Sequence, residues 1–187
     1  MKKVSFFLLA LMATLSLGAQ SEWKVDGAHS EVGFEITHLM ISTVSGEFGE
    51  FDITATAGDD FTTPTFNATI KTASVDTDVE RRDNHLRSAD FFEVETYPEI
   101  TFTTSEVTST GEKTFDLKGD MTMHGVTRPV TLKGKVIGVI TDQRSQKLKA
   151  GAELTTTINR LDFGVGGETA TLGNDIDITI RLEMAQQ

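Results

Sequence analysis

Hydrophobic residues recur at every second position over most of the chain, which is the pattern of β-strands with one buried face. In residues 30–38, for example, Val32, Phe34 and Ile36 share one face and polar residues alternate with them. The same alternation returns in further segments near residues 66–70, 100–102, 115–123, 130–136, 148–158 and 176–184. The pattern predicts an all-β fold of about eight strands joined by polar turns.

Two local features interrupt this alternation. Between Phe48 and Phe51 the hydrophobic phase changes at Gly49, which indicates a β-bulge and a bend in the strand. Residues 76–92, DTDVERRDNHLRSADFF, are charged and rich in helix-forming residues, and they predict a short helical segment. Within that segment, Ser88 is placed to cap a second short turn.

An even number of long, alternating, antiparallel strands favours an up-and-down β-barrel, and about eight strands leave room inside for one small ligand. Small residues alternate with large ones on the predicted inner face. They are Ala55, Ala68, Gly119, Gly134, Ala150 and Ala152. Such positions either leave a hollow interior or let the two sheets of a flattened sandwich approach closely. The pattern alone leaves both interpretations open.

The first residues predict a secretory signal peptide. Lys2 and Lys3 precede an apolar stretch that ends at Leu17, and small residues follow it. We expect cleavage after Ala19, with Gly18 as the alternative, so that residues 1–19 are the signal and residues 20–187 form a single domain. The chain contains no cysteine, so the exported domain is stabilised by its core rather than by disulfides. These features predict a periplasmic or secreted protein.

The chain is acidic. Its formal net charge is −11 at pH 7, and removal of Lys2 and Lys3 with the signal peptide takes the charge to −13. Such a surface repels nucleic acid and anionic lipid headgroups. We therefore expect no nucleic-acid partner and no stable membrane insertion. The sequence leaves the oligomeric state open, a homodimer included.

Four ordered patterns cover nearly the whole predicted domain. They read WKVDGAHSEVGFEITHLMISTVSGEFGEF (23–51), RRDNHLRSADFFEVETYPEITF (81–102), LKGDMTMHGVTRPVTL (117–132) and NRLDFGVG (159–166). Together they resemble the YceI-like family of exported polyisoprenoid-binding proteins, although Glu93 stands where that family more often has Asp. The resemblance implies a lipocalin-like barrel with a helical segment near its mouth. It also implies a long apolar tunnel that holds an isoprenoid chain or a similar amphiphile.

The candidate ligand-binding residues fall into two groups. The expected tunnel lining consists of large inward-facing residues: Val32, Phe34, Ile36, Phe48, Phe66, Ile70, Phe102, Leu117, Met121, Leu132, Leu154, Ile158 and Ile178. The expected mouth, where a headgroup would be held, consists of polar residues: His38, Arg82, Asp83, His85, Arg160 and Asp162. A buried Arg160 needs partners, and the other mouth residues are placed to supply them. The alternative role of this second group is a structural salt bridge that ties the helical segment to the barrel rim.

The favoured function is a carrier for a polyisoprenoid, an isoprenoid quinone or a similar amphiphile, which needs no cofactor and catalyses no reaction. One alternative is an enzyme that acts on an isoprenoid pyrophosphate or ester through His38, His85, Asp83 and Arg82. No nucleophile motif accompanies these residues. A second alternative is a stress-related interaction protein whose barrel is filled by its own side chains.

The histidines are not predicted to bind a metal. His29, His38, His85 and His124 match no usual ligand spacing. His124 precedes Gly125 in what reads as a hairpin turn, where an exposed polar residue is ordinary.

Overall fold

The computed structural model describes residues 20–187, so the predicted signal peptide lies outside the described residues. Most of the described chain is strand. The strands are β1 (Ser21–Val25), β2 (Glu31–His38), β3 (Ser42–Phe48), β4 (Phe51–Ala57), β5 (Thr65–Lys71), β6 (Val75–Asp76), β7 (Glu99–Ser109), β8 (Thr114–Met123), β9 (Val126–Thr141), β10 (Leu148–Asn159) and β11 (Leu172–Gln186). Short 3-10 turns lie at Gly27–His29, Thr72–Ser74 and Arg160–Phe163, and the α-helix of residues 20–187 is α1 (Glu80–Arg87).

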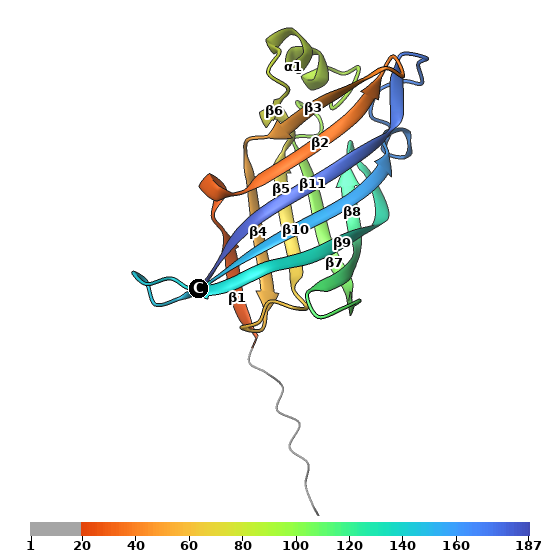
Figure 1. The fold of residues 1–187 in the computed structure, drawn as a ribbon. Coiled ribbons are helices and arrows are strands. Elements are labelled where there is room, and N and C mark those ends of the chain that lie inside the picture. The colour runs from red at the N-terminus through yellow and green to blue at the C-terminus, as the bar shows by residue number, and fades with distance from the viewer. Residues whose placement is uncertain (1–19) are drawn as a thin grey trace, which may run out of the picture.

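The strands form one sheet that closes on itself as a barrel (Figure 1). Eight strands follow one another around it by antiparallel pairing, and the pairing of β1 with β11 completes the circle. Strand β2 continues the course of β1 along β11, and β3 pairs with β2. This arrangement confirms the predicted up-and-down barrel and excludes the flattened sandwich.

The chain changes course at Gly49 as predicted, but through a break between two strands rather than through a β-bulge within one strand. Strand β3 ends at Phe48 and pairs with β6, whereas β4 begins at Phe51 and pairs with β5. At the break, the backbone N–H of Gly49 donates to the carbonyl of Ser74 at 3.1 Å. The change of hydrophobic phase therefore marks the point where this part of the chain changes its neighbour.

The helix is shorter than residues 76–92. Asp76 lies in β6, and its side chain accepts the N–H of Asp78 at 2.8 Å in the turn that precedes α1. Ser88 ends α1, because its N–H donates to the carbonyl of His85 at 3.1 Å. The charged composition located the segment but gave bounds that were too wide. Within residues 20–187, no helix combines the length and hydrophobicity that a membrane span requires.

The half of the barrel away from α1 is solidly packed. The ring of Trp23 meets that of Phe61 edge to face at 4.9 Å, and both side chains are fully buried. A Cβ atom added at Gly134 would overlap the ring of Phe115, and one added at Gly119 would overlap the ring of Phe102. The inference that small inward residues create the hollow is therefore wrong at these positions, because aromatic rings occupy the space that the glycines leave.

Candidate functional site

A cavity of about 650 Å³ occupies the other half of the barrel, beneath α1. This volume lies within the roughly 300–1,000 Å³ of small-molecule sites. Most of the wall is aliphatic or aromatic, and it is built by facing strands and by the segment around α1. Several of the predicted lining residues lie in this wall. They are Val32, Phe34, Ile36, Phe48, Ile70, Met121, Ile158 and Ile178.

The other predicted lining residues do not border the cavity. Phe66, Phe102, Leu117, Leu132 and Leu154 are buried in the hydrophobic core. They face inward as predicted, but alternation along a strand reports only the face of the sheet on which a side chain lies. Alternation carries no information about where along the barrel axis that side chain meets others.

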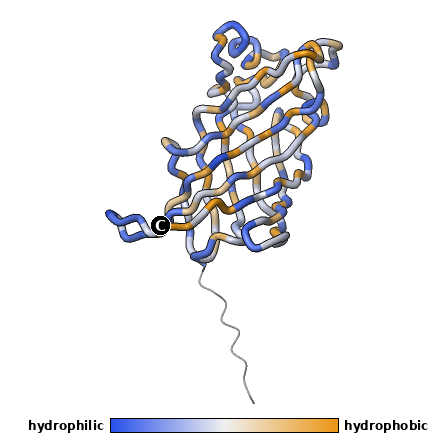
Figure 2. Tube along the Cα trace, viewed as in Figure 1, coloured by the Kyte–Doolittle hydropathy of each residue, from blue (hydrophilic) through white to orange (hydrophobic). Residues whose placement is uncertain are grey.

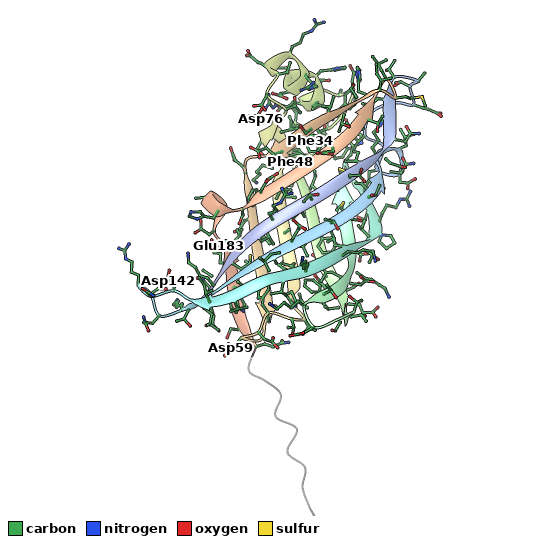
Figure 3. All side chains as sticks on the ribbon, viewed as in Figure 1. Phe34, Phe48, Asp59, Asp76, Asp142 and Glu183 are labelled. Carbon is green, nitrogen blue, oxygen red and sulfur yellow. The ribbon has the colours of Figure 1, made fainter. Side chains whose placement is uncertain are left out.

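The segment that contains α1 covers the cavity with residues that the strand pattern could not identify. Leu86, Phe91 and Phe92 lie in the cavity wall. The ring of Phe92 packs on that of Phe48 at 5.7 Å, and Phe48 packs on Phe34 at the same distance. Phe34 and Phe48 lie just below β6 and α1 (Figure 3). In the sequence, the adjacent Phe91 and Phe92 inside a charged segment were the feature that could have indicated a buried contribution to the cavity wall.

Within residues 20–187, hydrogen bonds rather than a salt bridge hold this segment: those of Asp83 and Arg82 run to Thr77 inside it, and those of Arg87 reach residues that precede it. The buried carboxylate of Asp83 accepts the N–H of Thr77 at 2.9 Å and also its hydroxyl. The guanidinium of Arg82 donates to the hydroxyl and the carbonyl of Thr77, each at 2.7 Å. Arg87 donates to the carbonyl of Ala73 at 2.7 Å. Asp83 is thus an anchor of the helical segment and does not border the cavity.

Four of the predicted mouth residues do line the cavity: His38, Arg82, His85 and Arg160. The ring of His85 makes a hydrogen bond of 3.1 Å with the carboxylate of Asp90, another lining residue. A few polar groups at one end of a mostly apolar cavity can orient the polar end of an amphiphile, while the apolar wall takes its chain.

Arg160 is almost completely buried, with 1% of its surface exposed. Its guanidinium donates to the carbonyls of Gly173, Val165 and Gly167 at 2.8, 2.9 and 3.0 Å. The expectation that carboxylates of the helical segment or Asp162 would pair with it is wrong, because these partners are neutral. Burial lowers the pKa of the guanidinium from its ordinary value. Arg160 therefore holds the rim loop of residues 164–171 against the start of β11 and presents a positive charge at the cavity wall.

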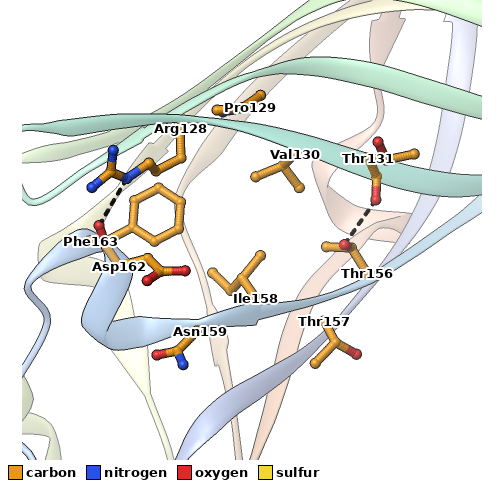
Figure 4. Close-up of a pocket in the computed structure, with 10 residues that line it drawn as sticks. All are labelled: Arg128, Pro129, Val130, Thr131, Thr156, Thr157, Ile158, Asn159, Asp162 and Phe163. Carbon is orange, nitrogen blue, oxygen red and sulfur yellow. Dashed lines mark hydrogen bonds between the residues drawn. The ribbon is translucent and has the colours of Figure 1, made fainter.

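A second hollow, of about 480 Å³, lies between β9 and β10 near the turn at Arg160–Phe163 (Figure 4). Pairing of these strands ends at Lys133 and Thr155, and Pro129 of β9 has no N–H with which to continue it. Asp162 lines this groove rather than the mouth, and its carbonyl accepts a hydrogen bond of 3.2 Å from Arg128. Ile158 contributes to the walls of both the groove and the cavity.

His124 and Gly125 form the predicted two-residue hairpin turn between β8 and β9. Their φ angles of 51° and 74° fit a turn of type I′. The expectation of an exposed His124 side chain is wrong. Its ring packs on that of Tyr97 at 4.5 Å between centroids, and its Nε2 lies 3.7 Å from the carboxylate of Glu93.

Asp26, His29 and Glu183 bring their side-chain ligand atoms within 4.8 Å of one another at the first turn. The ammonium of Lys149 lies 2.6 Å from the carboxylate of Glu183 and 3.9 Å from that of Asp26. The hydrogen bond from His29 lowers the pKa of Asp26, and the bond to Glu183 raises the pKa of Lys149. The lysine supplies the positive charge of this cluster, which is an ion-pair network that joins the turn after β1 to β10 and β11.

Comparisons with known proteins agree with this architecture. A family model described as the YceI-like domain matches residues 23–184. A UPF0312 protein of Pseudomonas putida (strain GB-1) is 40% identical over 195 residues, which cover 100% of both chains. The crystal structure of the Campylobacter jejuni YCEI protein aligns with a TM-score of 0.73 and 34% identity, covering 87% of this chain and 96% of that one.

A third match concerns the fold alone. A polyisoprenoid binding domain from Saccharophagus degradans, implicated in plant cell wall breakdown, aligns with a TM-score of 0.65 and 14% identity. The alignment covers 88% of this chain and 98% of that domain.

Proposed function

We propose that this chain, which belongs to the YceI-like family, is a carrier that holds the apolar chain of an amphiphile inside its barrel. The ligand class is a polyisoprenoid, an isoprenoid quinone or a similar lipid. The observation that carries the proposal is the apolar cavity of about 650 Å³ beneath α1. The Saccharophagus degradans domain, which has the same fold, is described as polyisoprenoid binding, and this supports the choice of ligand class.

The energetics favour recognition through the chain of the ligand rather than its head. Each methylene removed from water contributes about 0.8 kcal/mol, so ten methylenes supply roughly 8 kcal/mol before the ligand is ordered. A net hydrogen bond contributes only about 1 kcal/mol. The polar groups at the mouth, His38, His85 and Arg160, then fix the orientation of the ligand more than its affinity.

A binding role accounts for the polar residues better than catalysis does. The proposed acid-base set would need its members to reach the same bound substrate. Asp83 instead bonds to Thr77 and does not border the cavity, so one member of the set is held away from any bound ligand. A barrel filled by its own side chains fits only the half that contains Trp23 and Phe61, because the other half is hollow.

The cellular site of action is part of the proposal. The apolar stretch that precedes the barrel and the absence of cysteine support export to the periplasm or beyond the cell. Accumulation of a chain that starts at residue 20 in a periplasmic extract is the expected result. Retention of the full-length chain in the cytoplasm would contradict export without affecting the cavity.

Native mass spectrometry of the purified full chain, followed by organic extraction, tests the binding role. We expect a bound lipid, or stoichiometric uptake of an added isoprenoid. Ile178→Trp, which places a large ring in the cavity wall, should reduce that uptake by at least about tenfold. Thr103→Trp, on an exposed position of β7, is the matched control and should bind normally. Absence of bound or bindable lipid in the unaltered protein would rule out the proposal.

A further inference from the structure

The hairpin between β2 and β3 presents three hydrophobic side chains to solvent. Leu39 is 49% exposed, Met40 is 87% exposed and Ile41 is 85% exposed. Exposed large hydrophobic residues are ordinary when they are scattered singly, but three consecutive ones at a tip form a patch. Figure 2 shows the hydrophobic positions of this tip at the end of the barrel that carries α1.

The backbone of the tip makes this choice of residues unfavourable for folding. The N–H of Ile41 donates to the carbonyl of His38 at 3.2 Å, and Leu39 and Met40 have φ angles of 51° and 58°. Both residues thus have the left-handed φ of the two central positions of a type I′ turn, where Asn and Gly are favoured because this conformation strains larger residues. The chain places Leu and Met there, so folding and solubility do not explain the sequence of the tip.

The tip stands at the rim of the cavity. His38, which precedes it, lines the cavity and pairs with Leu172, another lining residue. The N–H of Leu39 donates to the carbonyl of Thr171 at 2.8 Å, and Thr171 also lines the cavity. A ligand that leaves the cavity past these residues therefore emerges beside the exposed tip.

The absence of acidic and basic residues distinguishes this part of the rim from the rest of the surface. The chain carries 28 acidic and 17 basic residues, yet residues 37–46 and 169–174 contain none of either kind. These two uncharged segments lie side by side, joined by the bond from Leu39 to Thr171. An acidic protein is repelled by anionic surfaces, so an uncharged apolar tip is the region that can approach a neutral bilayer.

We propose that the tip formed by Leu39, Met40 and Ile41 inserts transiently into the surface of an uncharged or zwitterionic lipid bilayer. Insertion places the rim of the cavity against the bilayer, so that the chain of the ligand passes between lipid and barrel without crossing water. The inference rests on the proposed carrier function. It adds the partner surface and the side of the barrel that faces it.

The test uses a variant that should fold at least as well as the natural chain. Leu39→Asn with Met40→Gly supplies the residues that a type I′ turn favours and removes most of the apolar tip. Ile137→Thr with Ile140→Thr is the matched control, because these β9 side chains are 58% and 64% exposed at the opposite end of the barrel. Neither pair lines the cavity.

Two measurements separate the tip from the cavity. The first is the uptake rate of fluorescent parinaric acid, offered either in aqueous solution or dissolved in phosphatidylcholine vesicles. The tip variant should take up the fatty acid from aqueous solution at the normal rate. Its rate of uptake from vesicles should fall by at least about tenfold. The second is flotation of the unloaded protein with the same vesicles. Flotation should be lost in the tip variant, retained in the control, and reduced when anionic lipid is added to the vesicles.

Equal uptake from vesicles by the tip variant and the natural chain would overturn the inference. So would a tip variant that changes a dimer to a monomer in sedimentation while vesicle uptake stays unchanged, since the tip would then bind a second copy. If no protein takes up the fatty acid but flotation still depends on the tip, the carrier function fails and the bilayer contact stands.

Discussion

Single side chains decide which half of this barrel is solid. Gly134 and Gly119 leave space on the inner face, and the rings of Phe115 and Phe102 fill it. Near α1, by contrast, aliphatic residues such as Ile70 of β5 and Ile178 of β11 line a cavity. The same inward alternation thus yields a packed core at one height and a hollow at another, according to which large residues reach the axis.

Gly134→Ala is expected to destabilise the protein, because the added Cβ atom would overlap the ring of Phe115. Overpacking of this kind costs about 1–3 kcal/mol in the free energy of unfolding. Gly138→Ala is the control on the same strand, since a Cβ atom there has no neighbour within 4 Å. Urea denaturation should show a lower midpoint for the first variant only. Equal midpoints would mean that the glycine does not make room for the ring.

Arg160→Met should destabilise the rim loop, because the buried carbonyl of Val165 and the partly buried carbonyls of Gly167 and Gly173 lose their donor. An unsatisfied buried acceptor costs about 1–3 kcal/mol and each partly buried hydrogen bond contributes about 1 kcal/mol, so the free energy of unfolding should fall by roughly 3 kcal/mol. Arg181→Met removes exposed ion pairs with Glu31 and Glu153 and should cost about 1 kcal/mol at most. Similar losses in the two variants, measured by urea denaturation, would contradict a structural role for Arg160.

Among the elements, the strands were easier to predict than the helix. Alternation located the bend at Gly49 and the strands around it, because burial on one face imposes a period of two. The helix α1 has only eight residues and no side-chain cap at Val79, so composition located it without fixing its ends. Its anchor, the hydrogen bonds between Thr77 and Asp83 six residues apart, is a local side-chain contact that leaves no periodic trace.

Weakening the anchor of α1 should loosen the cover of the cavity. Thr77→Val removes the hydroxyl that bonds both Asp83 and Arg82 while keeping a side chain of similar shape. We expect release of a bound fluorescent lipid to be about tenfold faster. The side-chain packing around Trp23 and Phe61, in the half of the barrel away from α1, should change little. Thr127→Val removes an exposed hydroxyl pair with Thr122 and is the control. Unchanged release from the Thr77 variant would show that α1 does not limit ligand exchange.

At the scale of the whole molecule, the alternating strands allowed either a closed barrel or a flattened sandwich, the family resemblance favoured the barrel, and the structure confirms the barrel. The position of the cavity did not follow, because it depends on how side chains from strands far apart in sequence meet at one height. Phe66 and Ile70 lie on the same face of β5, yet only Ile70 borders the cavity. Alternation assigns both to the interior and cannot separate them.

The size of the cavity limits the length of chain that the protein can enclose. A volume of 650 Å³ holds on the order of 20 non-hydrogen atoms, if each takes roughly the 30 Å³ of a water molecule. Affinity for a series of isoprenoid alcohols should therefore rise by about 0.8 kcal/mol per enclosed methylene-sized group and then level off near that length. Longer chains would leave their excess in water, or in a neighbouring bilayer, and gain nothing from the barrel. Calorimetric titration of the series measures the plateau, and Ile178→Trp should move it to shorter chains. An affinity that kept rising well beyond this length would mean that the packed half around Trp23 and Phe61 opens to admit the ligand.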